Sequence, residues 1–184
     1  MIKITLPDGS VKEFASGVTP HEVALSISEG LARNVISASF NGTTIETATP
    51  LTTDGSLVLY TWNDAEGKKA FWHSTSHVMA QALEEKFPGI KLTIGPAIEN
   101  GFYYDVDFGD KRITDADFKD IEDRVLAIAK EKHEFKMRSA SKAEALELYK
   151  DNEYKTELIT NLEDGTITFC DHATFTDLCR GGHI

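Results

Sequence analysis

The segment from residue 71 to residue 87, FWHSTSHVMAQALEEKF, constrains the fold most because its apolar residues recur at helical spacing. Pro88 and Gly89 follow directly and cannot continue a helix. His73 and His77 are four residues apart, so a helix places their imidazoles side by side at the border of the apolar stripe. We therefore expect a helix that presents two histidines to the wall of a cleft.

A second pair with the same spacing lies in the segment LCRGGHI, where Cys179 precedes His183 by four residues. Pairs of this kind are often chance features at the surface, but two of them suggest one composite site. Three imidazoles and a thiol are a common set of zinc ligands. The same groups can also carry out metal-free chemistry, because histidine titrates near neutral pH and can deprotonate water. The residues alone leave both kinds of site open.

The composition excludes several classes of protein. With 41% hydrophobic and 27% charged residues among 184, the chain is typical of soluble globular proteins. No apolar run approaches membrane-spanning length and the N-terminus lacks a signal peptide, so we expect a cytoplasmic protein that does not enter membranes. A net charge of −11 argues against a protein that grips DNA or RNA over a broad basic surface. It still permits a site that receives the end of an RNA.

The first 62 residues predict a small independent domain. Ile2, Ile4 and Leu6 alternate as in a half-buried strand, and a turn leads to a second strand through Val11 and Phe14. Two further strands are expected at residues 35–40 and 57–60, and the polar segment at 61–70 marks the boundary of the domain.

A helix separates the two pairs of strands. Thr19 is its expected N-cap, Pro20 its first residue and Glu22 the partner of Thr19 in a capping box. Gly30 is expected to end it. The order strand, strand, helix, strand, strand is that of a ubiquitin-like β-grasp fold.

This first domain resembles the TGS domain of threonyl-tRNA synthetases and of some GTPases and stringent-response enzymes. Such domains contain no catalytic motif, so the resemblance implies a binding or spacer module without chemistry.

The remaining residues, 63–184, predict an α+β domain with helices packed on an antiparallel sheet. The segment KLTIGPAIENGFYYDVDF suggests two strands joined by a Gly-Pro turn. Thr114 with Asp117, and Ser141 with Glu144, predict the capped starts of two helices. A strand is expected through residues 135–137 and another at 166–170, before a helix-like or turn-like segment, TFTDLCRGGHI.

Three motifs of this second domain resemble the editing domain of bacterial-type threonyl-tRNA synthetases: the HxxxH helix, IGPxIxxGFYYD and DLCRGGH. The family signature at the third motif is D-x-C-x-G-P-H, and Gly182 replaces its proline, which should loosen the turn. The resemblance covers all 184 residues. It implies an N-terminal fragment whose editing domain is truncated at its C-terminal end.

The resemblance implies an enzyme that hydrolyses mischarged seryl-tRNA(Thr) in proofreading, while the full-length protein ligates threonine to its tRNA with ATP. The implied partner is the acceptor end of tRNA(Thr) carrying serine. Editing needs no cofactor by this resemblance. ATP, magnesium and zinc are expected for the aminoacylation domain outside this chain, and a homodimer is expected through such outside domains.

The resemblance also implies roles for seven residues. His73 and Lys155 would position and activate water near the terminal ribose. His77, Cys179 and His183 would shape the pocket, and the remaining two, Tyr104 and Asp177, would contact the seryl group.

Two other functions remain open at this stage. The alanyl-tRNA editing proteins carry the same HxxxH and CxxxH pattern and bind zinc with it, so His73, His77, Cys179 and His183 could be zinc ligands. A catalytically silent RNA-docking module is the third hypothesis. A zinc protease is disfavoured, because Ser74 stands where the HExxH motif requires glutamate.

Overall fold

The computed structural model describes residues 1–184, and the chain divides into two compact units. The first unit contains Met1–Trp72 together with Gly181–Ile184, and the second contains His73–Arg180. The fold is mixed, with helices packed on sheets, as predicted. None of the helices is both long and apolar enough to cross a membrane.

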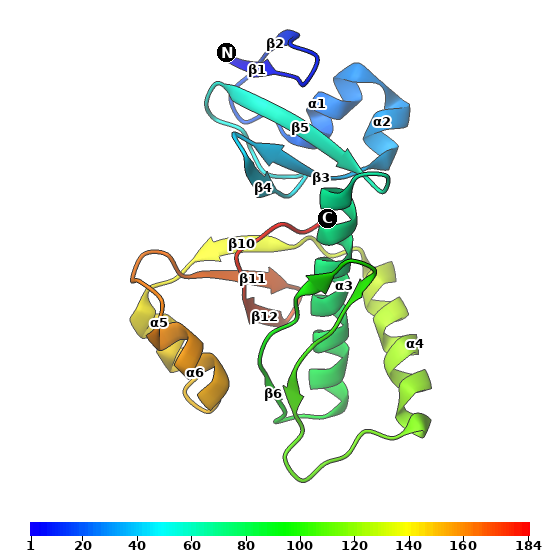
Figure 1. Ribbon diagram of the computed structural model, residues 1–184, viewed down its shortest axis with the longest axis vertical. Helices are drawn as coiled ribbons and strands as arrows, with labels where there is room; N and C mark the ends of the chain where they lie inside the picture. Colours follow the sequence, from blue (N-terminus) through cyan, green and yellow to red (C-terminus); the bar gives the residue numbers. More distant parts are fainter. The chain divides into compact units, whose positions relative to one another are not determined.

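The first unit has the predicted β-grasp fold (Figure 1). Its elements are β1 (Ile2–Thr5), β2 (Val11–Phe14), α1 (Pro20–Ile27), α2 (Glu29–Asn34), β3 (Val35–Phe40), β4 (Thr43–Ile45) and β5 (Gly55–Thr61). The sheet order is β2-β1-β5-β3-β4, and the central pair β1 and β5 is parallel. Val23 of α1 packs on Ile4, Ala38 and Leu57 of the sheet, which forms the core of this unit.

The start of α1 is as predicted, but its end is not. Thr19 and Glu22 form the capping box, and Pro20 is the first helical residue. The prediction that Gly30 ends this helix is wrong, because α1 ends at Ile27 and Gly30 lies inside α2. The extended Ser28 separates the two helices, and its hydroxyl accepts a hydrogen bond from the Leu31 amide at 3.0 Å, which caps α2.

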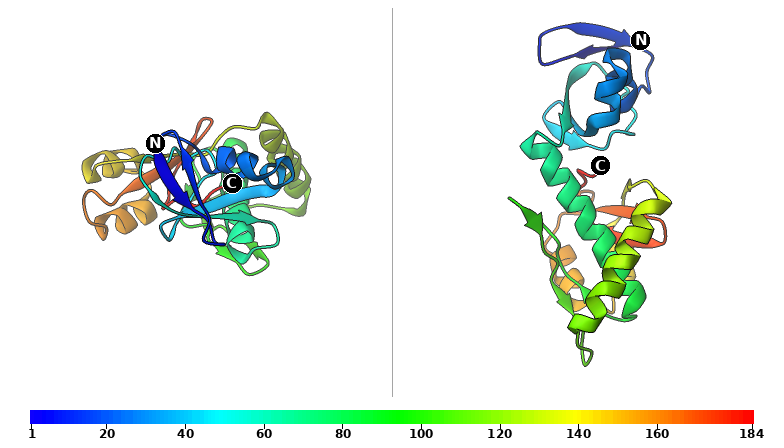
Figure 2. Two further views of the ribbon diagram at one scale, coloured as in Figure 1. Left: turned by 90° about the horizontal axis from the view of Figure 1, so that it is seen from above. Right: turned by 90° about the vertical axis from the view of Figure 1, so that its right-hand side faces the viewer.

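The second unit is built from longer helices and several short strands. Its elements are α3 (Ala65–Lys86, which starts in the first unit), β6 (Lys91–Leu92), β7 (Ala97–Ile98), β8 (Gly101–Phe102), β9 (Val106–Asp107), α4 (Asp115–Glu131), β10 (Lys136–Ser139), α5 (Lys142–Leu148), α6 (Glu153–Thr160), β11 (Thr168–His172) and β12 (Phe175–Leu178). Figures 1 and 2 show α4 lying alongside α3. Apolar residues of both helices form one core with Ile90, Leu92 and Phe175.

The antiparallel sheet β10-β11-β12 corrects one prediction. The segment from Thr174 to Leu178 was expected to be helix-like or turn-like, but Phe175–Leu178 is the strand β12. Ala173 adopts a left-handed conformation, with φ 52°, and allows β11 to turn directly into β12. This hairpin matters for the site, because β12 carries Asp177.

The connection between α3 and α4 corrects a second prediction. Gly95-Pro96 was expected to be the turn of a hairpin, but the turn lies at residues 99–100, between β7 and β8. β6 and β9 then pair farther from the turn. Gly95 lies within the long arm of this hairpin, where its backbone contacts the site described below.

Candidate functional site

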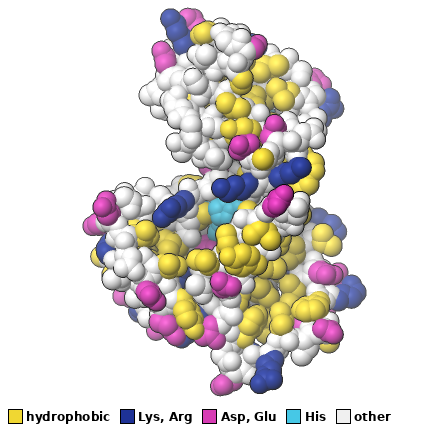
Figure 3. All heavy atoms as spheres, in the orientation of Figure 1, with side chains coloured by type: hydrophobic (Ala, Val, Ile, Leu, Met, Phe, Trp, Pro, Cys, Tyr) yellow, Lys and Arg dark blue, Asp and Glu magenta, His cyan; other side chains and the backbone are white.

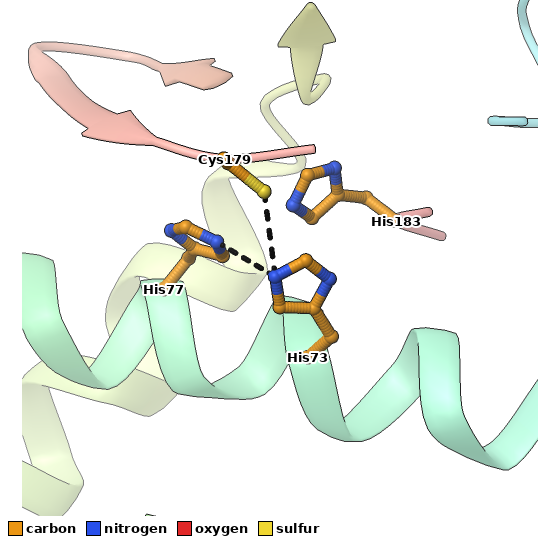
Figure 4. Close-up of side chains that lie close together, drawn as sticks. All are labelled: His73, His77, Cys179 and His183. Atoms are coloured by element: carbon orange, nitrogen blue, oxygen red, sulfur yellow. Dashed lines mark hydrogen bonds between the residues drawn. The ribbon is translucent and has the colours of Figure 1, made fainter. Parts of the chain in front are cut away.

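A group of two imidazoles and a thiol lies on one side of α3 (Figure 4). The Nε2 atoms of His73 and His77 are 3.1 Å apart, as the four-residue spacing on a helix predicts. Cys179, immediately after β12, places its Sγ atom 3.4 Å from His73 Nε2. His77 and Cys179 are buried, whereas His73 is only partly buried. The group therefore has one member within reach of solvent.

Asp177 is the centre of a second, buried group next to these residues. Lys155 Nζ donates a hydrogen bond to one carboxylate oxygen, and Tyr104 Oη donates to the other. His77 Nδ1 lies 3.2 Å from the oxygen that Tyr104 contacts. Asp177 lies in β12 and Cys179 follows the strand directly, with its amide bonded to the Thr168 carbonyl, so the two side chains face the same side of the sheet. The histidine pair and the carboxylate thus form one connected site.

Lys155 is held in place by the start of α6. The Asn152 side chain caps this helix and accepts a hydrogen bond from the Lys155 amide at 3.1 Å. Only 2% of the Lys155 side chain is exposed, and the Asp177 side chain is similarly buried. A buried ammonium requires a paired charge, and Asp177 supplies it.

The charges around Asp177 determine its protonation state. Burial alone raises the pKa of a carboxyl group, but the charge and hydrogen bond of Lys155 and the close approach of His77 outweigh it and lower the pKa of Asp177 to about 2. Burial and the Asp177 charge raise the pKa of Tyr104 well above its ordinary value. At neutral pH, Asp177 is therefore a carboxylate and Tyr104 a neutral donor.

Two residues outside the seven predicted ones support Tyr104. The Ser76 hydroxyl lies 2.8 Å from the carbonyl oxygen of Gly95, which joins α3 to the hairpin arm. The Tyr104 ring lies so close to Gly95 that a Cβ atom there would collide with the ring. The sequence signal for this contact is Gly95 itself, since glycine often marks a close approach to a neighbouring group.

A pocket of about 780 Å³ opens on the site and lies wholly within the second unit. His73, His77, Lys155 and Cys179 line it together with apolar side chains such as Ile94. A mostly apolar pocket with a few convergent polar groups is typical of ligand-binding sites. On the face drawn in Figure 3, hydrophobic side chains gather around a histidine, and charges of both signs are mixed over the surface.

His183 belongs to the first unit and is fully buried. Its Nδ1 atom lies 3.2 Å from Oε1 of Glu46, in the segment after β4. Burial raises the pKa of Glu46, but the hydrogen bonds from His183 and from the backbone outweigh it and hold this pKa below its ordinary value. Only three residues separate His183 from Cys179, so their Cα atoms are at most about 14 Å apart.

The donor atoms of His73, His77 and Cys179 also fit a zinc ion. They lie within 4.8 Å of one another. Tetrahedral zinc with bonds of about 2.0–2.3 Å requires ligand atoms roughly 3.3–3.6 Å apart. The separations of His73 Nε2 from His77 Nε2 and from Cys179 Sγ, 3.1 and 3.4 Å, are close to that range. Small side-chain adjustments would therefore allow these three residues to hold the metal.

Comparisons with known proteins identify relatives over the whole chain. Residues 2–61 match the family described as the TGS domain. The full chain is 83% identical to a protein named threonine–tRNA ligase from Flavobacterium johnsoniae and 80% identical to one of that name from Flavobacterium psychrophilum. A threonine–tRNA ligase from Cytophaga hutchinsonii is 52% identical. All of this chain is covered in each case, but it spans only 28–29% of the length of these relatives.

Proposed function

The chain matches the N-terminal region of bacterial threonine–tRNA ligases. We therefore propose that residues 63–184 are a proofreading domain that hydrolyses seryl-tRNA(Thr). Residues 1–62 would be the TGS domain, in agreement with the match of residues 2–61 to that family. In the intact enzyme, further domains would ligate threonine to its tRNA with ATP, in the cytoplasm and as a homodimer. The substrate of this chain is then the acceptor end of tRNA(Thr) that carries serine.

A hydrolytic site separate from the aminoacylation site is needed because binding alone discriminates poorly between serine and threonine. A pocket that accepts threonine also accepts serine, which has the same hydroxyl group and lacks one methyl group. One methyl group contributes only about 1–3 kcal/mol to discrimination in binding. Protein synthesis needs a larger ratio, and hydrolysis of the wrong product supplies it.

The observation that carries the proposal is the convergence of separate motifs on the 780 Å³ pocket. The helix α3 contributes His73 and His77, α6 contributes Lys155, and the end of β12 contributes Cys179. Ester hydrolysis requires a positioned water, a group that accepts its proton, and stabilisation of the negative charge that develops. The pocket wall offers groups suited to each of these tasks.

We assign to His73 the role of accepting the proton from the attacking water. The Asp177 carboxylate, 3.2 Å from His77 Nδ1, favours the tautomer of His77 with its proton on Nδ1. His77 Nε2 then accepts a hydrogen bond from His73 Nε2, which leaves the lone pair of a neutral His73 ring on Nδ1. His73 is also the partly exposed member of the pair, so it is the one suited to take a proton from a water in the pocket.

Lys155 would stabilise the charge that develops on the reacting oxygen. An ammonium group carries three N–H donors, and one of them binds Asp177. Because Lys155 also lines the pocket, its charge lies beside the space that the ester would occupy. Cys179 and His77 shape the pocket wall, and His183 is proposed as a further member of this site.

Tyr104 and Asp177 would contact the seryl group. A carboxylate has about four positions for hydrogen bonds. Lys155, Tyr104 and His77 surround Asp177 at three of them. The fourth would receive the seryl ammonium, for which a carboxylate is a suitable partner.

The experiment is a deacylation assay of the 184-residue chain with seryl-tRNA(Thr), comparing His73→Asn with the parent. Loss of the proton acceptor should lower the rate by about 10²–10⁴-fold. His21→Asn, at an exposed position of α1, is the matched control and should retain the parent rate. A His73→Asn variant as fast as the parent would contradict the assignment, and a parent without activity would favour the silent RNA-docking module.

The fit of the donor atoms favours one alternative, a zinc-dependent hydrolase related to the alanyl-tRNA editing proteins. His73, His77, Cys179 and His183 would then hold the ion. Bound there, zinc would lower the pKa of a water molecule and so supply hydroxide. Metal content and deacylation rate, measured before and after treatment with a chelator, separate the two functions. The metal-free proposal expects an unchanged rate in protein without zinc, whereas the alternative requires stoichiometric zinc and loss of activity.

A further inference from the structure

Glu46 of the TGS domain binds the segment that carries His183. Its Oε1 atom accepts hydrogen bonds from the backbone amides of Gly182 and His183, at 3.1 and 3.3 Å, and lies 3.2 Å from His183 Nδ1. Thr49 donates to the other oxygen, Oε2, at 3.3 Å. Both oxygens of this carboxylate are therefore engaged, so its orientation is fixed.

The backbone at Gly182 permits this arrangement. Its φ angle is +86°, in the region that favours glycine, and its amide donates to Glu46. Proline would lack the N–H group and could not adopt this φ angle. The segment was expected to be loosened by Gly182, but here that glycine supplies a hydrogen bond that ties it to Glu46.

The contact between Glu46 and His183 also selects a tautomer. A carboxylate accepts hydrogen bonds and does not donate them, so the imidazole nitrogen next to it carries the proton. With the proton of His183 on Nδ1, the lone pair of the neutral ring is on Nε2. Carboxylates that bind one nitrogen of an active-site histidine orient the ring and define the role of the other nitrogen.

We propose that Glu46 is a positioning residue for His183, which it holds in the Nδ1–H tautomer with the lone pair of the neutral ring on Nε2. If His183 takes part in hydrolysis, as the proposed function holds, Glu46 would define which of its two ring nitrogens carries the lone pair. The positioning role of Glu46 toward His183 is inferred from their contacts alone. Its consequence for hydrolysis rests on the proposed function.

The direct test is the tautomer of His183, observed by nitrogen-15 NMR of the imidazole nitrogens in the whole 184-residue chain. His183→Asn identifies the signals by their loss. We expect the proton on Nδ1 in the parent and in Glu46→Gln, whose amide oxygen can still accept it. Glu46→Ala should shift the ring toward the Nε2–H tautomer. A parent ring protonated on Nε2, or a Glu46→Ala spectrum equal to that of the parent, would overturn the proposal.

The second readout is deacylation of seryl-tRNA(Thr) by the same variants. Glu46→Ala should lower kcat about 10–100-fold with little change in KM, and Glu46→Gln should restore most of the rate. Glu13→Ala, the same change at an exposed site of β2, is the matched control and should leave the rate unchanged. Parent kinetics in Glu46→Ala would overturn the role in catalysis. A parent that does not hydrolyse the ester contradicts the proposed function instead, while the NMR result still decides the assignment of Glu46.

Discussion

At the scale of single residues, the buried ion pair between Lys155 and Asp177 is the feature whose burial is the most costly in free energy. Almost none of either side chain is exposed. Burying two charges costs several kcal/mol for each ion, and only close pairing with further hydrogen bonds offsets that cost. Tyr104 and His77 supply further contacts to the carboxylate. We infer that the pair is kept for its position beside the pocket more than for stability.

This inference predicts a pattern in the stability of variants. Lys155→Met or Asp177→Asn alone should lower the free energy of unfolding by about 3–5 kcal/mol, because each leaves one buried charge uncompensated. The double variant should recover much of the loss, since it removes both charges. Urea denaturation of the 184-residue chain measures all three. Equal additive losses in the double variant would show that the two charges are not coupled.

The sequence predicted which residue types the candidate site contains but not which of them are buried. The four-residue spacing of His73 and His77 is a local property of a helix, so it could be read from the chain directly. The burial of Lys155 could not, because lysine is usually solvated and the partner that allows its burial is 22 residues away in the sequence. Ser76 was not singled out and Gly95 was expected only in a turn, because the contacts of Gly95 with Ser76 and Tyr104 join residues that are distant in the sequence.

At the scale of elements, the predictions succeeded where local signals and tertiary packing agree. The capping box of Thr19 and Glu22 and the alternating residues of β1 are examples. The strand β12 was missed because its inward side carries Asp177 next to Phe175, and a buried carboxylate hides the alternation of apolar and polar residues. The residue that obscures the strand is the one that the proposed site requires.

The hairpin arm between α3 and α4 gives a prediction at this scale. Gly95→Ala should lower the free energy of unfolding by about 1–3 kcal/mol, because the new methyl group collides with the Tyr104 ring and the bond to Asp177 restrains that ring.

The matched control for this change is Gly30→Ala, inside α2, where no group crowds the added Cβ. It should stabilise the chain by about 0.5–1 kcal/mol, since alanine loses less conformational entropy in a helix. Thermal or urea unfolding of both variants decides the matter. If Gly95→Ala left the free energy of unfolding unchanged, the Tyr104 ring could move away from the new methyl group without loss of stability, which would contradict the prediction.

At the scale of the whole molecule, the negative charge limits how the proposed RNA substrate would bind. A net charge of −11 argues against a broad basic surface that would release many counterions from a nucleic acid. We therefore expect KM for seryl-tRNA(Thr) to rise less than about tenfold when salt increases from about 50 to about 200 mM. A rise of about 10³-fold or more would indicate a broad phosphate interface and contradict binding through the acceptor end alone.

The proposed function requires that this chain removes serine, and not threonine, from tRNA(Thr). The most direct measurement is the deacylation rate of the 184-residue chain with seryl-tRNA(Thr) and threonyl-tRNA(Thr) side by side, each against the rate without protein. We predict rapid loss of serine and a rate of threonine loss near that of the protein-free control. Equal hydrolysis of both esters, or faster hydrolysis of threonyl-tRNA(Thr), would contradict it.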